Sequence, residues 1–183
     1  MKLTALLYGL QEGYKSADLL KKANAAALIS LRWPEKARDS DPEENDTLNV
    51  LELRDQAPST PAVLAKNGVK FALYSGGIER RADLIRAVKR ALDAGLSQDD
   101  ALRAMTLSVA EIYGVADRLG SIEKGKIANL VVTKGDLFQE RTEVKYVLVD
   151  GVKFEPVEEP PPPGLRPDVP TGPTADVPRG GTR

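Results

Sequence analysis

The chain has 183 residues, of which 42% are hydrophobic and 29% are charged, a composition typical of one globular core with tails. Its 26 basic and 27 acidic residues give a net charge of −1, so no overall field favours nucleic acid or an anionic membrane as a partner. The chain contains no cysteine and no histidine, which excludes disulfides, thiolate chemistry and imidazole ligands.

No targeting or membrane segment is expected. Met1 is followed by the strand-like LTALLY rather than by an export signal, and no apolar run reaches the roughly 20 residues that span a bilayer. Many exported proteins also lack disulfides, so the compartment stays unknown.

The first elements have the pattern strand, helix, strand. Leu3–Tyr8 is short and apolar, Tyr14–Lys22 carries Ala17 and Leu20 on one helical face, and Ala26–Leu31 is again apolar. Because the apolar runs are continuous, we expect both strands to be buried in a parallel sheet with a right-handed crossover. The order predicts an α/β fold.

A long charged connection follows the second strand. Trp33 and Pro34 end the strand, and EKARDSDPEEND leads into a helix that Asp41 can cap, with Pro42 in the first turn. Long connections at the carboxyl end of a strand often carry function in α/β proteins, although a solvated insertion is the more frequent explanation.

Clear start and stop signals surround the third strand. Thr60 and Pro61 predict a helix cap and first turn, and Asn67–Gly68 predicts the end of that helix. The strand Val69–Tyr74 then runs into Ser75–Gly77, a flexible turn. In parallel barrels such turns face the active site.

Three further helices are predicted. Ala82–Ala94 has apolar residues at helical spacing, and Ser97 with Asp100 forms a capping pair for the next helix. Ser108 and Glu111 repeat that spacing and predict a third helix capped in the same way.

A small antiparallel β module follows Gly120. Strand patterns cover Ala128–Thr133, Val144–Val149 and Val152–Phe154, and Asp150–Gly151 between the last two is a strong hairpin signal. The remaining sequence is rich in proline and glycine and is expected to be disordered. A passive tail is favoured there over a ligand for a proline-binding module.

Several motifs resemble the closing segment of the metal-dependent amidohydrolase superfamily. They are Ala101–Leu102 with Thr106, LGSIEKGKIANLVV from Leu119 to Val132, and VKYVLVDG from Val144 to Gly151. The segments EGYKSADLLKKA, ALISLRWPEK and APSTPAVLAKNGVKFALYSGG are most similar to its imidazolonepropionase- and prolidase-like branch.

This resemblance covers about Leu3 to Phe154 and implies a fold class: an α/β, partial (β/α)8 TIM-barrel segment plus a small antiparallel β-sandwich remnant. Residues 1–118 would form about the last three strand-helix units of the barrel, without its N-terminal part. Residues 119–155 would form the C-terminal β-sandwich portion, and residues 156–183 the Pro-rich tail.

The resemblance also implies where metal chemistry would lie. Family members hold one or two divalent metals such as zinc at the carboxyl ends of the barrel strands, and the metal activates a water. Where the family has a ligand histidine this chain has Tyr8–Gly9–Leu10, and where it has a metal-binding, proton-shuttling aspartate this chain has Gly76. We therefore expect no catalytic residue, metal ligand or cofactor in this chain.

Weak candidates for a substrate rim remain in Arg32, Trp33 and Ser75. Arg32 beside Trp33 could hold a carboxylate against an aromatic face. The more frequent alternative is a solvated arginine next to a tryptophan that covers apolar surface.

Two hypotheses for function follow. In the first, the chain is a C-terminal segment of a hydrolase of amide, lactam or peptide-like C–N bonds, inactive alone and dependent on a missing N-terminal half. In the second, it is a non-catalytic scaffold or interaction module derived from an amidohydrolase. An open sheet edge beside Leu3–Tyr8 could then mediate self-association.

Overall fold

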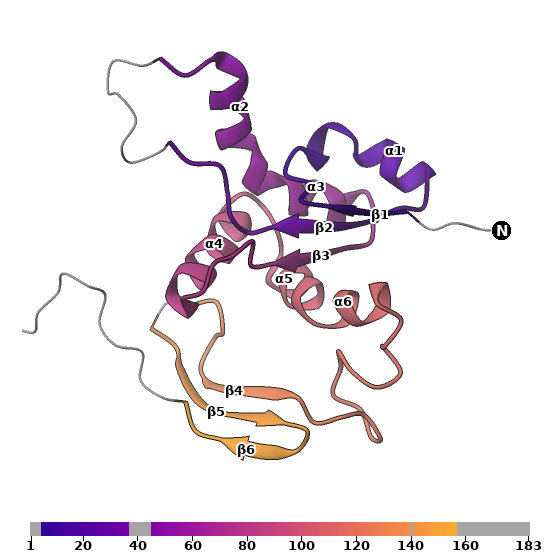
Figure 1. Cartoon of the computed structure of the whole chain (residues 1–183), viewed down its shortest axis with the longest axis vertical. Coiled ribbons are helices and arrows are strands. Elements are labelled where there is room, and N and C mark those ends of the chain that lie inside the picture. The colour runs from indigo at the N-terminus through magenta and orange to yellow at the C-terminus, as the bar shows by residue number, and fades with distance from the viewer. Residues whose placement is uncertain (1–4, 37–44, 140, 157–183) are drawn as a thin grey trace, which may run out of the picture.

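The computed structural model describes residues 5–36, 45–139 and 141–156, and Figure 1 shows two separate three-stranded sheets. The first sheet is parallel and has the order β1 (Leu6–Tyr8), β2 (Ala26–Ser30), β3 (Phe71–Tyr74). The predicted α/β order and parallel pairing are confirmed.

The core lies between one face of this sheet and the helices that connect or follow its strands. Figure 1 shows α1 (Ala17–Lys22) and α3 (Thr60–Lys66) near β1 and β2, and α5 (Gln98–Met105) and α6 (Leu107–Ile112) near β3. Alternate strand residues join the helices in one buried cluster, because side chains two apart share a face. Its members include Ala27, Ile29, Phe71, Leu73, Leu64, Val88, Ala91 and Ala101.

The predicted burial of both first strands is wrong for β1. All five residues of β2 are buried, whereas Leu6, Leu7 and Tyr8 are 44%, 37% and 70% exposed. The continuous apolar run predicts a strand buried on both faces, but within the described residues β1 pairs only with β2. It is therefore an edge strand with an apolar surface.

The helix predicted at Tyr14–Lys22 divides into two elements. Gly13–Lys15 forms the 3-10 turn η1, and α1 follows with Ala17 and Leu20 buried as predicted. The confirmed part is the one that the apolar spacing predicted.

A helix follows the long connection after β2. Asp41 and Pro42 lie outside the described residues, and the helix described in this region is α2 (Leu48–Gln56), which starts after Thr47 and buries no side chain. A 3-10 turn, η2 (Ala57–Ser59), joins it to α3. Thr60 lies inside α3 rather than capping it, since its hydroxyl donates to the Gln11 carbonyl at 2.7 Å.

The remaining helices follow the predicted bounds closely. The long helix is α4 (Arg81–Asp93), and α5 begins after Ser97, whose hydroxyl accepts from the Asp100 amide at 3.0 Å. The repeated cap is wrong, because α6 begins after Thr106 and Ser108 is buried within it. Within the described part of the chain, no helix is long and apolar enough to cross a membrane.

The second sheet is antiparallel and consists of β4 (Leu130–Lys134), β5 (Glu143–Val149) and β6 (Val152–Phe154). The predicted hairpin is confirmed, with positive φ values of 50° at Asp150 and 81° at Gly151. The loop before β5 joins this sheet to the first unit, since Phe138 is buried in the core and Arg81 donates to the Thr142 carbonyl.

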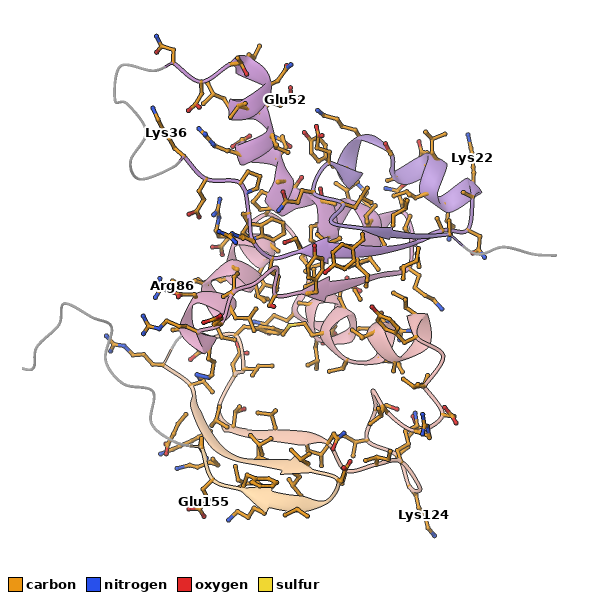
Figure 2. All side chains as sticks on the ribbon, viewed as in Figure 1. Lys22, Lys36, Glu52, Arg86, Lys124 and Glu155 are labelled. Carbon is orange, nitrogen blue, oxygen red and sulfur yellow. The ribbon has the colours of Figure 1, made fainter. Side chains whose placement is uncertain are left out.

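Charged side chains cover the outside of both units. Figure 2 labels six of them, all exposed, and they point away from the ribbon: Lys22, Lys36, Glu52, Arg86, Lys124 and Glu155. The tail predicted from residue 156 falls almost entirely outside the described residues.

Candidate functional site

The carboxyl edge of the parallel sheet is the place to look for chemistry, because parallel strands all end there. Tyr8 ends β1, Ser30 ends β2 and Tyr74 ends β3. The register pairs Ser30 with Tyr74 and Tyr8 with Leu28, so the side chains of Tyr8, Ser30 and Tyr74 lie on one face.

The turn after β3 is built around Gly76. Its φ is +64°, a left-handed conformation that side chains rarely adopt. A Cβ added there would overlap Ser30 Oγ and lie 2.9 Å from Arg32 Cβ. Ser30 is buried, and its hydroxyl accepts from the Arg32 amide at 3.2 Å. The position that the resemblance assigns to an aspartate is therefore closed to a side chain in this conformation.

Two phenol rings occupy the same edge. The rings of Tyr8 and Tyr74 are stacked, with centroids 4.4 Å apart and an interplanar angle of 28°. A side-chain hydrogen bond with Tyr74 is the main reason that the pKa of Tyr8 is raised above its usual value. The phenol of Tyr8 therefore stays neutral at physiological pH and supplies no anionic ligand.

The three rim candidates do not converge. Arg32 is exposed and lies against the Ser75–Gly77 turn, because a Cβ at Gly77 would be 3.9 Å from Arg32 Nη1. Ser75 lies half-buried in that turn. Trp33 instead points into the core, where it is 5% exposed and its Nε1 donates to the Ala87 carbonyl at 2.8 Å. Trp33 therefore does not supply the aromatic face against which Arg32 could hold a carboxylate.

Sequence reasoning overlooked Ser30 and Tyr74. A signal for them existed, since each is the last residue of an apolar strand followed by a break or a glycine turn. Their pairing across the sheet depends on the strand register, which the sequence does not state.

The donors at this edge do not fit a divalent metal. Hydrolytic sites use imidazole and carboxylate ligands. The chain has no histidine or cysteine, and nowhere in residues 5–36, 45–139 and 141–156 do three or more acidic side chains come together as a possible ion site. At the strand ends Tyr8 and Ser30 offer neutral hydroxyls, and Gly76 offers no side chain at all.

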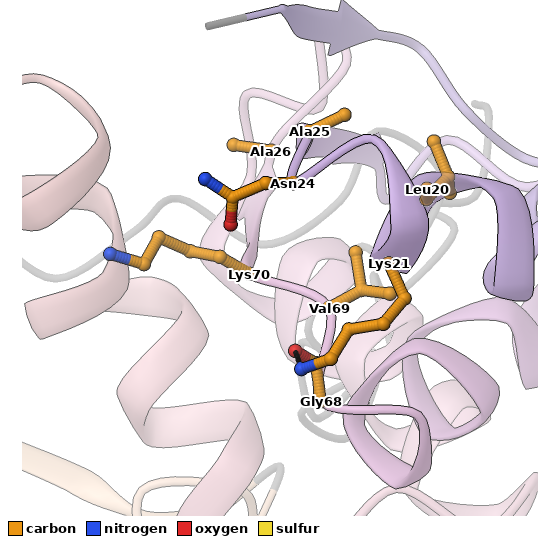
Figure 3. A pocket seen from close by; sticks show the side chains of 8 residues that line it. All are labelled: Leu20, Lys21, Asn24, Ala25, Ala26, Gly68, Val69 and Lys70. Carbon is orange, nitrogen blue, oxygen red and sulfur yellow. Dashed lines mark hydrogen bonds between the residues drawn. The ribbon is translucent and has the colours of Figure 1, made fainter.

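A hollow of about 210 Å³ lies at the opposite, amino edge of the sheet. Figure 3 shows its lining, which consists of Leu20, Lys21, Asn24, Ala25, Ala26, Gly68, Val69 and Lys70. Lys21 Nζ donates to the Gly68 carbonyl at 2.8 Å, and Lys70 Nζ lies 3.1 Å from the Glu111 carboxylate. Hydrogen bonding to Lys70 is the main cause that lowers the pKa of Glu111. The first contact joins α1 to the turn after α3, and the second joins the residue before β3 to α6, so both lysine amines of the lining are engaged in contacts within the chain.

The sequence of residues 10–153 matches the model of the amidohydrolase family. The chain belongs to the amidohydrolase family. A shorter stretch of 68 residues, 37% of the chain, is 40% identical to the adenine deaminase of Moorella thermoacetica and covers 11% of that protein.

Solved amidohydrolases have the same fold over most of the chain. An amidohydrolase from Thermotoga maritima matches with a TM-score of 0.64 and 29% identity, covering 82% of this chain and 37% of that one. A Xaa-Pro dipeptidase with bound methionine matches with a TM-score of 0.65 at 20% identity, over 83% of this chain and 40% of the dipeptidase. The chain therefore spans less than half the length of these solved relatives.

Proposed function

We propose that this chain is the C-terminal portion of an amidohydrolase of the imidazolonepropionase- and prolidase-like branch. In this proposal residues 1–118 form the last strand-helix units of a TIM barrel, residues 119–155 the β-sandwich portion, and residues 156–183 a tail. The match over residues 10–153 and the parallel sheet followed by an antiparallel one support the proposal.

The complete enzyme would hydrolyse a C–N bond, and this chain would be inactive alone. The observation that carries this inference is the turn at Gly76, the position that the resemblance assigns to the family acid, where a side chain would overlap Ser30. Without a ligand set, this chain cannot lower the pKa of a water and make it nucleophilic at neutral pH. Its own contribution would be the rim residues Arg32 and Ser75 and the frame that holds them.

Two exposed apolar surfaces support the proposal that a second polypeptide binds this chain. In the described residues the outer edge of β1 is unpaired, and Leu6, Leu7 and Tyr8 are exposed. One face of the second sheet also presents exposed apolar side chains, which are Val131, Val149, Val152 and Phe154. In the proposal, a polypeptide with the first strands of the barrel covers both surfaces.

The test is reconstitution. The full chain is purified alone and together with a polypeptide that carries the first five strands of an amidohydrolase barrel, ideally one encoded beside it. Binding, metal content and amide or lactam hydrolysis are then measured. The proposal expects a stable complex, and any hydrolysis only in that complex, with its metal ligands and acid supplied by the added polypeptide because Gly76 still carries no side chain. Amide cleavage by the isolated chain, or failure of the two polypeptides to associate, would contradict it.

The exposed edge of β1 also favours a second candidate, a non-catalytic scaffold that associates with itself. An uncovered apolar edge strand is a template for pairing with another chain. Gel filtration with light scattering on the full chain distinguishes the two candidates. Dimers that dissociate when Leu7 is replaced by lysine would favour the scaffold, whereas a concentration-independent monomer would exclude edge-mediated assembly.

A further inference from the structure

The stacked pair of Tyr8 and Tyr74 at the carboxyl edge has a geometry suited to an oxidation that is separate from hydrolysis. Tyr8 and Tyr74 lie on β1 and β3, and their rings meet across the central strand β2. Neighbouring strands lie about 4.8 Å apart, so the two backbones are separated by roughly twice that distance. Long side chains bridge it, and Tyr8 is 70% exposed and open to reagents.

We propose that Tyr8 and Tyr74 form an oxidation site at which a one-electron oxidant couples the two phenols into a dityrosine within one chain. Each phenol gives one electron to the oxidant and one proton to water, leaving two phenoxyl radicals. The radicals join through a new bond between ring carbons ortho to the oxygens. The two ortho hydrogens then move as protons to the oxygens, and the product has lost two hydrogen atoms overall.

The other tyrosines are less suited to this reaction. The ammonium of Lys15 lies 5.4 Å from the ring centroid of Tyr14, and the ammonium of Lys153 lies 4.9 Å from that of Tyr146. A cation over a ring opposes removal of an electron from it. The fifth residue, Tyr113, is 59% exposed, but among the described aromatic rings the stacked contact is the one between Tyr8 and Tyr74.

The consequence of coupling is mechanical. The bond would tie the exposed edge strand β1 to β3 and close a long loop of chain, which restricts the unfolded state as a disulfide does. Oxidation would thereby hold β1, the edge strand at which the proposed partner binds, in its place beside β2. The inference does not depend on that assembly, because it rests on the ring geometry of the chain alone.

The test uses the full chain, diluted to suppress contacts between molecules, with photoactivated ruthenium tris-bipyridyl and persulfate as the one-electron oxidant. Mass spectrometry should show a monomer lighter by two hydrogen atoms and a cross-linked pair of peptides containing Tyr8 and Tyr74. Dityrosine fluorescence should rise in parallel, and the midpoint of urea unfolding should shift upward.

Phenylalanine variants keep the rings and serve as matched controls. Tyr8→Phe and Tyr74→Phe should each lose the cross-link, whereas Tyr113→Phe should form it to the wild-type extent. The proposal is overturned if the wild type gives no product, if covalent dimers form instead, or if the cross-link persists without Tyr8.

Discussion

Placing an alanine at position 76 tests the claim that the turn at Gly76 leaves no room for a side chain. The left-handed backbone at Gly76 costs a side-chain-bearing residue about 1–2 kcal/mol. The new Cβ also overlaps Ser30 Oγ and crowds Arg32 Cβ, and such overpacking costs about 1–3 kcal/mol. Gly76→Ala should therefore reduce the free energy of unfolding by about 2–5 kcal/mol, a large part of a typical total.

The neighbouring glycine provides a matched control. Gly77 has a φ of +87°, and a Cβ there would meet only Arg32 Nη1, at 3.9 Å. Gly77→Ala should therefore carry only the backbone cost of about 1–2 kcal/mol. Urea unfolding can be followed by fluorescence of Trp33, the single tryptophan, which is buried.

A double variant identifies the atom responsible. Ser30→Ala removes the nearest atom, so the cost of Gly76→Ala should fall when both changes are combined, with a coupling of about 0.5–3 kcal/mol. Equal destabilisation by Gly76→Ala and Gly77→Ala, or strict additivity with Ser30→Ala, would refute the argument that Ser30 closes this position.

Three further predictions concern the frame around the site. Trp33→Phe should destabilise the chain by about 1–3 kcal/mol in thermal unfolding by circular dichroism, because the hydrogen bond from the indole to the Ala87 carbonyl is lost and the buried ring becomes smaller. A neutral result would place the indole outside the core. Glu111→Gln should destabilise at neutral pH, and the difference from wild type should vanish as the pH falls through the lowered folded pKa of Glu111, since protonation breaks its pairing with Lys70. A pH-independent difference would contradict that pairing. Ser97→Ala should cost about 0.5–2 kcal/mol through loss of the α5 cap, whereas Ser59→Ala, at a helix start without such a bond, should cost less in the same assay.

Local signals predicted most of the elements because their causes lie within a few residues. The cap at Ser97, the hairpin at Asp150–Gly151 and the turn at Gly76 each follow from backbone requirements that sequence states directly. The strand-helix order, and with it the α/β fold, followed from apolar periodicity.

Other features depended on contacts between distant segments. The run at Leu6–Tyr8 looks like a core strand, yet its burial depends on what lies beyond the sheet edge. Trp33 could have faced a ligand or the core, and the position of α4 decides this through the Ala87 carbonyl. The contact of Tyr8 with Tyr74 required the register of three strands. The spacing at Ser108 and Glu111 matched a cap, but Glu111 pairs with Lys70 and Arg103 instead.

Zinc binding by the isolated full chain tests the central claim most directly. The chain is dialysed to equilibrium against buffered zinc, and the protein and buffer compartments are compared by metal analysis. The account predicts equal zinc in both compartments, because the strand ends present Tyr8, Ser30 and Gly76 in place of charged ligands. One equivalent of tightly held zinc per chain, lost on substitution of residues at this edge, would contradict it.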